Sequence, residues 1–496
     1  MLFNTLTYGG FFLAVFVVHW LLPQRARRPF LLIASYYFYA SAIPQYLLLI
    51  LTLTAANYGF GLWLGRAVGR TKRVALWVGI GGNLACLGFF KYSGLLASSA
   101  VSIARHLPGI LQPVQDPIVV NVVLPLGISF FTFEFIHYLA EVYKGLRPMK
   151  HPIDFALFAA FFPTQIAGPI KRFPDFAKQL LHPQRFREVD FDAGIGLILR
   201  GLLKKVLLAD VLSPLVAVAF AQPGALGPAA AWFAVFAFAA QIYGDFSGYT
   251  DIGRGSALLL GYWVPENFSR PYQSATPAEF WHRWHMSLST WLRDYLYIPL
   301  GGSRVARWRV YVNLMITMAL GGLWHGASWH FMVWGVYQGV LLCGHRLWSR
   351  TVGRVPLYAG AMATVAGQFV SRAATLVLVC AGWVIFRAPS VGASLRMFRS
   401  MVAIHRPAWA GLHPAALSTP MLLMLGVTVV VVGGWVYAIA RPLMGGVWER
   451  AAVRVRSEWW PAAHVFFVRP AFFAAAVLLL TLWPPHSSPR FIYFQF

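Results

Sequence analysis

The chain has 496 residues, of which 58% are hydrophobic and only 11% are charged. A soluble domain of average composition is about a quarter charged, so this chain could not cover its own surface with polar groups in water. The net charge of +25 would suggest nucleic acid in a soluble protein, but here the basic residues form short runs between apolar stretches. That pattern is typical of membrane proteins, so we expect a lipid bilayer rather than nucleic acid as the partner.

Apolar stretches recur along the whole chain, and a helix of roughly 20 apolar residues crosses a bilayer. The candidate spans are 7–23, 29–43, 45–65, 74–92, 118–143, 204–221, 229–247, 308–324, 329–346, 367–387, 420–440 and 466–484. Several are short or contain Pro and Gly, so we expect an all-α polytopic membrane protein with about 10–12 transmembrane helices. The first stretch lacks a preceding basic segment, which predicts a retained span rather than a cleaved signal.

Basic residues follow every second span over most of the chain, for example after 7–23 and 45–65. Because Lys and Arg concentrate in cytoplasmic loops, this pattern predicts that both termini face outward. Arg396, Arg399 and Arg406 break the pattern, and they favour an interfacial amphipathic helix within 388–419.

Two regions do not have the character of plain spans. Residues 152–173 are apolar but are interrupted by Pro163, Gly168 and Pro169, which favours a re-entrant hairpin. Residues 248–306 mix aromatic, charged and Pro residues, and such backbone is tolerated at membrane depth only inside protein or beside water. We therefore expect the functional core in 248–306. The chain shows no internal repeat, which disfavours a transporter.

The first candidate constellation is Glu279, His282 and His285. A helix starting near Thr276-Pro277 would be well capped, and spacing by three would align these side chains along one flank. They could line a catalytic pocket, face water on an interfacial helix, or contribute to a di-metal site of the Glu-x-x-His type.

The second constellation is the turn around Trp324-His325-Gly326, which lies between two apolar stretches. A histidine is costly to bury in a membrane without purpose, so His325 is a functional candidate by default. The alternative is a histidine satisfied by a backbone carbonyl. Nearby small residues, such as Gly321 and Gly322, would allow close helix packing.

The third constellation lies where span 229–247 is expected to end, and it contains Asp245, Ser247, Asp251 and Arg254. Asp251 and Arg254 could pair at three-residue spacing on a helix. An ion pair at a helix end explains these residues at least as well as direct catalysis does.

Some enzyme classes lack support in the sequence. There is no adjacent His-His pair of the kind that membrane metal oxidases use, no HExxH metalloprotease pattern and no Walker A loop. A metal-dependent oxidase built on Glu279, His282 and His285 stays open as an alternative, as does a transporter or export subunit without covalent chemistry.

Together, several long segments resemble the membrane-bound O-acyltransferase (MBOAT) family. They are PLGISFFTFEFIHYLAEVYKG from Pro125, FFPTQIAGPIKRF from Phe161, QIYGDFSGYTDIGRG from Gln241, ENFSRPYQSATPAEFWHRWHMSLSTWLRDYLYIPLGG from Glu266, GGLWHGASWHFMVWG from Gly321 and the C-terminal FIYFQF. The resemblance is strongest to the branch that acetylates exported bacterial polysaccharides such as alginate, and a D-alanyl transferase branch is more distant. It implies one membrane domain over 1–496, with a core over 120–346, peripheral helices over 1–119 and 347–496, and a central tunnel.

The resemblance also implies an activity and a site. His325 would be the catalytic residue, and His285 matches the family's second recurrent position. Substrate-binding or pocket positions would be Trp324, Gly326, Trp284, His282, Arg293, Asp294, Tyr295, Asp245 and Ser247. No metal or bound cofactor is implied, and acetyl-CoA or another acyl thioester would be the donor substrate.

The implied enzyme is an O-acetyltransferase of the bacterial inner membrane. It would move acetyl from a cytoplasmic donor to an exported polysaccharide, with alginate as the best guess, or to periplasmic acyltransferase partners. A neutral imidazole can accept a proton from a hydroxyl at physiological pH. The loop charges place His285 toward the cytoplasm and His325 at the outer end of a span, so a shared site requires the two to be joined through the membrane.

Overall fold

The computed structural model describes residues 1, 3–106, 124–166, 168–412 and 417–443, together with positions 471, 474, 477 and 478. Every regular element in these residues is helical, which confirms the predicted all-α class. Five of these helices are long and apolar enough to cross a membrane, by length and composition alone: Pro44–Arg66, Gly69–Ile103, Pro228–Leu259, Val365–Arg387 and Thr419–Ile439. The predicted span 466–484 and the C-terminal FIYFQF segment lie almost wholly outside the described residues.

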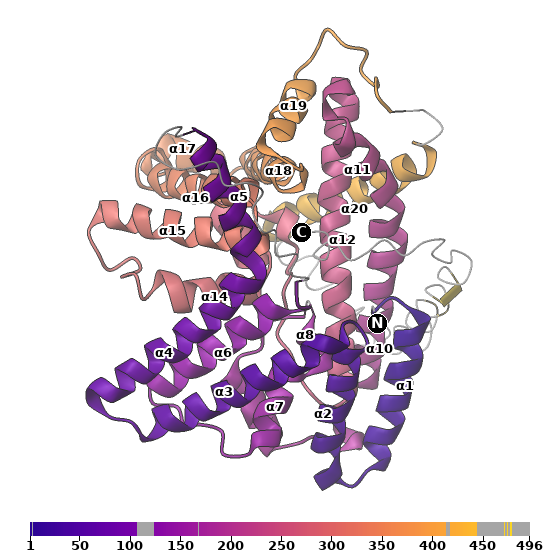
Figure 1. The fold of residues 1–496 in the computed structure, drawn as a ribbon. Helices are drawn as coiled ribbons and strands as arrows, with labels where there is room; N and C mark the ends of the chain where they lie inside the picture. The colour runs from indigo at the N-terminus through magenta and orange to yellow at the C-terminus, as the bar shows by residue number, and fades with distance from the viewer. Residues whose placement is uncertain are drawn as a thin grey trace.

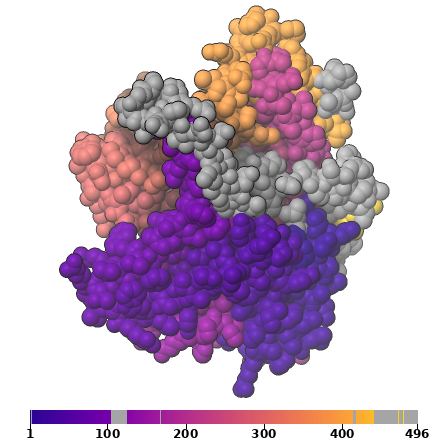
Figure 2. Space-filling view, in the orientation of Figure 1, coloured from indigo at the N-terminus to yellow at the C-terminus, as the bar shows by residue number. Residues whose placement is uncertain are grey.

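The N-terminal helices are α1 (Leu6–Leu21), α2 (Gln24–Ala40), α3 (Leu47–Arg66) and α4 (Gly69–Leu87). They form the lower part of the face in Figure 2, in indigo and violet. The amides of Asn57 and Asn83 exchange hydrogen bonds of 3.0 and 2.7 Å between α3 and α4. Such polar pairs stabilise helix packing where apolar surroundings give little driving force.

The helix that contains the predicted span 74–92 is longer than that span. Helix α4 runs without a break through a π-helical turn, Gly88–Tyr92, into α5 (Ser93–His106). This continuous helix rises beside α15 and α16 in Figure 1, and the indole N–H of Trp329 on α16 donates to the Ser99 hydroxyl of α5 at 3.0 Å. The N-terminal helices therefore contact the start of α16.

Helix α6 (Ile128–Tyr143) is a core helix, because every residue from Ile128 to Leu139 is buried. The region 152–173 is broken as predicted, into α7 (Pro152–Ala160), α8 (Phe162–Gln165) and an irregular stretch before α9 (Phe173–Leu181). Lys171 of that stretch forms a buried ion pair with Glu134 of α6 at 2.8 Å. Irregular backbone is thus enclosed by protein, as its polar groups require.

Two long helices lie side by side. The first comprises α10 (Phe191–Leu202), a π-helical segment Leu203–Asp210 and α11 (Val211–Ala221), and the second is α12 (Pro228–Leu259). Gly248 permits their close approach, because a Cβ there would lie 2.7 Å from the Gly201 carbonyl oxygen and 3.1 Å from the Lys205 backbone nitrogen of the first helix. The first helix begins at Phe191, thirteen residues before the predicted span 204–221. It begins there because the Asp190 side chain caps it by accepting a hydrogen bond from Ala193 N at 2.9 Å.

The remaining helices surround the site. They are α13 (Pro277–Arg283), α14 (Met286–Leu292) with a π-helical turn Arg293–Tyr297, α15 (Arg307–His325), α16 (Trp329–Arg350), α17 (Pro356–Ala363), α18 (Val365–Arg387), α19 (Val391–Met401) and α20 (Ser418–Leu443). Helix α19 falls in the segment where an amphipathic helix was predicted, and it buries one set of residues that includes Ala393, Met397 and Met401.

Candidate active site

His325 is the last residue of α15, and the chain leaves the helix at Gly326, which is extended (φ −163°, ψ 150°). Gly326 is required by packing, because a Cβ there would lie 2.2 Å from the Phe331 ring. Only three residues separate α15 from α16, so the two helices form a tight hairpin. The turn therefore places His325 against the first turns of α16.

Aromatic rings enclose the imidazole of His325, and this residue is only 7% exposed. Ring centroids lie 5.1 Å away for Trp324, 5.2 Å for Trp334 on α16 and 5.5 Å for Phe386 on α18. Trp334 and Phe386 were not singled out from the sequence. Trp334 lies within the GGLWHGASWHFMVWG segment, and the short turn between two apolar stretches was the signal that could have found it.

His285 meets His325 in space, with ring centroids 6.4 Å apart. Helix α13 ends at Arg283, Trp284 is extended, and His285 takes a left-handed conformation (φ 44°) before α14 begins. This reversal turns the fully buried His285 ring toward Phe246, at 4.7 Å, and Trp324, at 6.0 Å. The two histidines that the loop charges placed on opposite sides of the membrane thus lie in one site.

The predicted alignment of Glu279, His282 and His285 along one helical flank is wrong, because the helix stops between them. Thr276 and Pro277 start α13 as predicted, and the Thr276 hydroxyl accepts from Glu279 N at 3.1 Å. The Glu279 carboxylate accepts from Ala275 N and pairs with Arg283, each at 2.7 Å. Glu279 is therefore a capping residue, and His282 is exposed on the helix surface.

No metal site emerges from this constellation. In the described parts of the chain, no three His, Cys, Asp or Glu side chains group together as ligands. The proposed set of Glu279, His282 and His285 is divided by the end of α13, so its ligand geometry gives no support to a metal-dependent oxidase.

Buried hydrogen-bond donors surround the histidines. Among the described residues, the indole N–H groups of Trp324 and Trp334 and both ring nitrogens of His285 have no partner. Burial lowers the pKa of His285 to about 3, so its ring is neutral at physiological pH. A buried donor without a partner costs about 1–3 kcal/mol, so such groups are expected where a ligand supplies the partner.

The third constellation lies inside a helix rather than at its end, because α12 continues to Leu259. Asp245 forms a buried ion pair with Lys205 at 2.7 Å. Asp251 pairs with Lys204 at 2.7 Å and with Arg254 at 3.7 Å. These carboxylates join α12 to its neighbouring helix and match the ion-pair interpretation.

Two further predicted positions are buried near the site. Ser247 is 1% exposed and follows Phe246, whose ring contacts His285. Trp284 packs on Phe280, Phe268 and Trp383, with ring centroids 4.8–5.5 Å apart. Trp284 therefore supports the backbone next to His285.

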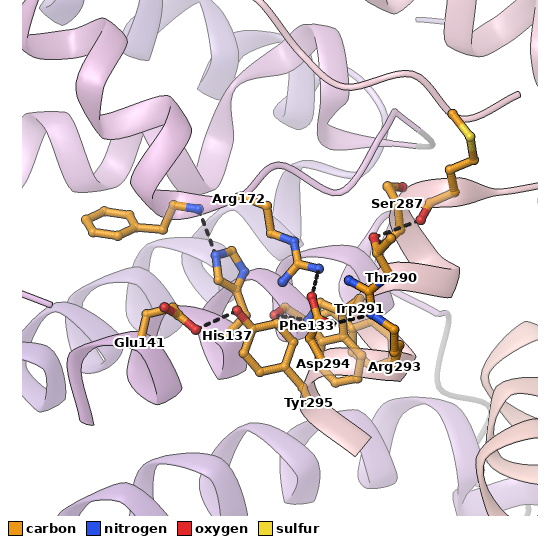
Figure 3. Close-up of polar contacts among 12 residues, drawn as sticks. Phe133, His137, Glu141, Arg172, Ser287, Thr290, Trp291, Arg293, Asp294 and Tyr295 are labelled. Atoms are coloured by element: carbon orange, nitrogen blue, oxygen red, sulfur yellow. Dashed lines mark hydrogen bonds and ion pairs between the residues drawn. The ribbon is translucent and has the colours of Figure 1, made fainter. Parts of the chain in front are cut away.

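Arg293, Asp294 and Tyr295 form a separate polar cluster with residues of α6 and the loop before α9 (Figure 3). Asp294 accepts hydrogen bonds from Arg172 and Arg293, each at 2.7 Å. Partial burial alone would raise the pKa of Asp294, but the hydrogen bonds and charges of Arg172 and Arg293 lower this pKa below its ordinary value. The Tyr295 hydroxyl donates to Glu141 at 2.9 Å.

A column of aromatic rings joins this cluster to His325. Tyr295 lies 5.4 Å from Trp291, and Trp291 stacks on Phe133 with centroids 3.7 Å apart. Phe133 in turn lies 5.5 Å from Trp324, the neighbour of His325. The Trp291 indole N–H donates to the Phe133 carbonyl at 3.0 Å, which fixes the middle of the column.

A paired-histidine site at the end of a buried helix, within an all-helical membrane fold, matches the family suggested by the motifs. The model of the membrane-bound O-acyltransferase family matches residues 119–372, and the chain belongs to that family. It is an O-acyltransferase and a multi-pass membrane protein.

Curated relatives carry three kinds of name. The chain is 36% identical to the "Probable alginate O-acetylase AlgI" of Azotobacter vinelandii, over 100% of both chains. It is 32% identical to the "Peptidoglycan O-acetyltransferase" of Helicobacter pylori, over 82% of this chain and 80% of that one. It is also 32% identical to the "Teichoic acid D-alanyltransferase" of Streptococcus thermophilus, over 45% of this chain and 57% of that one.

Proposed function

We propose that this protein transfers acetyl groups from a cytoplasmic acyl thioester, acetyl-CoA, to a hydroxyl of an exported polysaccharide, with His325 as general base. The observation that carries the proposal is the meeting of His325 and His285, whose ring centroids are 6.4 Å apart, in a site where the indole N–H groups of Trp324 and Trp334 have no partner among the described residues. Alginate is the proposed acceptor, because full-length similarity extends to a protein named for alginate O-acetylation.

The chemistry follows from these groups. The His325 imidazole takes the proton of the acceptor hydroxyl, and the oxygen attacks the thioester carbonyl. The tetrahedral oxyanion that forms needs positioned donors, and Trp324, Trp334 or His285 can provide them. The C–S bond then breaks, and the thiolate leaves with the proton that the imidazole had taken. General-base help typically contributes about 10²–10⁴-fold, so the oxyanion donors must contribute much of the rest.

The cluster of Arg172, Arg293 and Tyr295 is proposed as the donor side of the site. Its cations suit the phosphates of an acyl carrier such as CoA. The column from Tyr295 to Trp324 leads from there to His325, and along it we propose the central tunnel. Because His325 and His285 are both buried, substrate entry requires this path to open.

The acceptor side is proposed to face the periplasm of the bacterial inner membrane. Periplasmic acyltransferase partners would complete the transfer to polymer where the hydroxyl that accepts acetyl at His325 belongs to a protein rather than to the polysaccharide. The names of the relatives, which cite polysaccharide or cell-wall acceptors, support an exported polymer.

The proposal is tested by His325→Ala in cells that lack the native copy, with acetyl esters of the exported polysaccharide as the measurement. We expect acetylation to fall by at least about 10²-fold. His345→Ala, on α16 but outside the site, is the matched control and should retain acetylation. Normal acetylation by a His325→Ala protein that reaches the membrane in normal amount would refute the proposal.

A further inference from the structure

Two residues of the N-terminal helices contact the end of the helix that carries His325. The Lys91 ammonium donates to the Trp324 carbonyl oxygen and, at 3.3 Å, to the Ser129 hydroxyl of α6. The Tyr92 hydroxyl donates to the Leu323 carbonyl oxygen at 2.9 Å. The ammonium also lies 5.7 Å from the centre of the Trp324 ring. The contacts of Lys91 with Trp324 and of Tyr92 with Leu323 join residues more than 230 positions apart in the sequence.

The end of α15 needs such partners. The last carbonyls of any α-helix have no following helical N–H group, and they carry the negative end of the helix dipole. Here the chain turns into an extended conformation at Gly326, so the next residues do not continue the helix to cap it. A lysine cation and a tyrosine hydroxyl satisfy the carbonyls of the two residues that precede His325.

A π-helical turn presents both side chains together. In a regular α-helix, adjacent residues point about 100° apart, so neighbours rarely reach the same target. The turn Gly88–Tyr92 widens the helix at this point, and π-helical turns are frequent at functional sites. Lys91 and Tyr92 lie before residue 119, where the match to the family model begins.

We propose that Lys91 and Tyr92 are positioning residues, which lock the last turn of α15 and hold the His325 imidazole in its reactive orientation. Lys91 fixes the carbonyl next to His325 and anchors it to α6 through Ser129, while Tyr92 fixes the preceding carbonyl. The 1–119 segment, expected to be peripheral, would then be part of the catalytic apparatus. This inference rests on the proposed function, because it takes His325 as the reacting group.

The test compares Lys91→Met, Lys91→Arg and Tyr92→Phe in protein reconstituted in lipid nanodiscs, with acetyl-CoA as donor, unacetylated alginate as acceptor and release of the CoA thiol as readout. Misplacing a reacting group by about 1 Å can cost about 10²-fold in rate. We expect Lys91→Met to lower kcat by about 10–100-fold with KM nearly unchanged, and Tyr92→Phe to lower it less. Lys91→Arg keeps the cation and should recover most of the rate. Lys72→Met, on the same continuous helix, is the matched control.

A second readout does not depend on acetyl transfer. Diethyl pyrocarbonate modifies accessible imidazoles, and mass spectrometry measures its rate at His325. We expect faster modification in Lys91→Met and Tyr92→Phe than in wild type and in Lys72→Met. If Lys91→Met fails to fold, Tyr92→Phe tests the positioning role instead, because it removes only one oxygen atom.

The outcomes separate the two proposals. Unchanged kcat and unchanged modification in the variants would overturn the positioning role, and so would a rise in KM alone, which would mean that Lys91 binds substrate. If wild-type protein releases no thiol from acetyl-CoA in the presence of alginate while modification of His325 still responds to Lys91→Met, the proposed donor and acceptor pair fails and the positioning role stands.

Discussion

At the residue scale, the proposed chemistry depends on how few polar groups surround His325. Its ring contacts Trp324, Trp334 and Phe386 and the neutral ring of His285. In such a water-poor site, a few directed N–H groups act more strongly than they would in water. The indole of Trp334 is well placed for this role, because it is buried, perpendicular to the imidazole and without a hydrogen-bond partner among the described residues.

We therefore predict that Trp334→Phe, which keeps a ring but removes the N–H, lowers kcat by about 10²-fold, as the loss of one oxyanion donor typically does. Thiol release from acetyl-CoA by reconstituted protein, in the presence of alginate as acceptor, measures the effect. Trp348→Phe is the matched control, since Trp348 lies at the far end of α16 and its indole bonds to Tyr358 instead. A Trp334→Phe protein of wild-type kcat would remove Trp334 from the oxyanion site.

At the scale of elements, the α15–α16 hairpin places the turn that carries His325. The two helices approach closely at Gly322 and Gly335: a Cβ on Gly335 would lie 2.3 Å from the Met318 carbonyl oxygen and 3.0 Å from the Gly322 Cα. Backbone atoms cannot rotate away as a side chain can. Glycine at these positions therefore sets the helix spacing that brings Trp334 to His325.

Gly335→Ala should separate the two helices and lower the stability of the protein by about 1–3 kcal/mol, the usual cost of overpacking. Gly344→Ala is the control on the same helix, because nothing lies within 4 Å of a Cβ at that position. It should be neutral or slightly stabilising, since alanine favours the helix over glycine. Thermal unfolding in detergent, followed by tryptophan fluorescence, compares the two, and equal melting temperatures would contradict the packing argument.

At the scale of the whole molecule, helices distant in sequence converge on one buried site. The N-terminal helix α4–α5, the core helix α6 and the hairpin α15–α16 meet at Trp324, through Lys91, Phe133 and the turn itself (Figure 1). The basic cluster at Arg172 and Arg293 lies at the other end of the aromatic column. This arrangement suits a donor and an acceptor that approach the histidines from opposite sides.

Sidedness can be measured directly. Acetyl-CoA does not cross membranes, so inverted inner-membrane vesicles, whose cytoplasmic face is outward, should consume added acetyl-CoA when alginate is enclosed in their lumen. Right-side-out vesicles with alginate outside should not. His325→Ala vesicles correct for other enzymes that consume acetyl-CoA. Consumption restricted to right-side-out vesicles would reverse the proposed direction of transfer.

The sequence by itself determined the all-α membrane class, the family and the candidacy of His325. Composition indicates that the protein is surrounded by lipid, and the motif around His325 is one contiguous segment. Neither signal depends on contacts between residues that are distant in the sequence. Many helix positions were also predictable from apolar runs, but their ends were not. Helices α10 and α12 extend beyond the predicted spans, because capping by Asp190 and ion pairs to Lys205 and Lys204 make polar segments helical.

Only the tertiary structure decided which residues meet. His285 was misplaced on a flank with Glu279, because a left-handed residue after α13 redirects the chain and leaves no periodic trace in the sequence. The contacts of Lys91 and Tyr92 with the end of α15 join distant segments, and a single sequence holds no signal for them. The short distance between His285 and His325 likewise results from how the helices pack, so it could not be predicted from local patterns of residues.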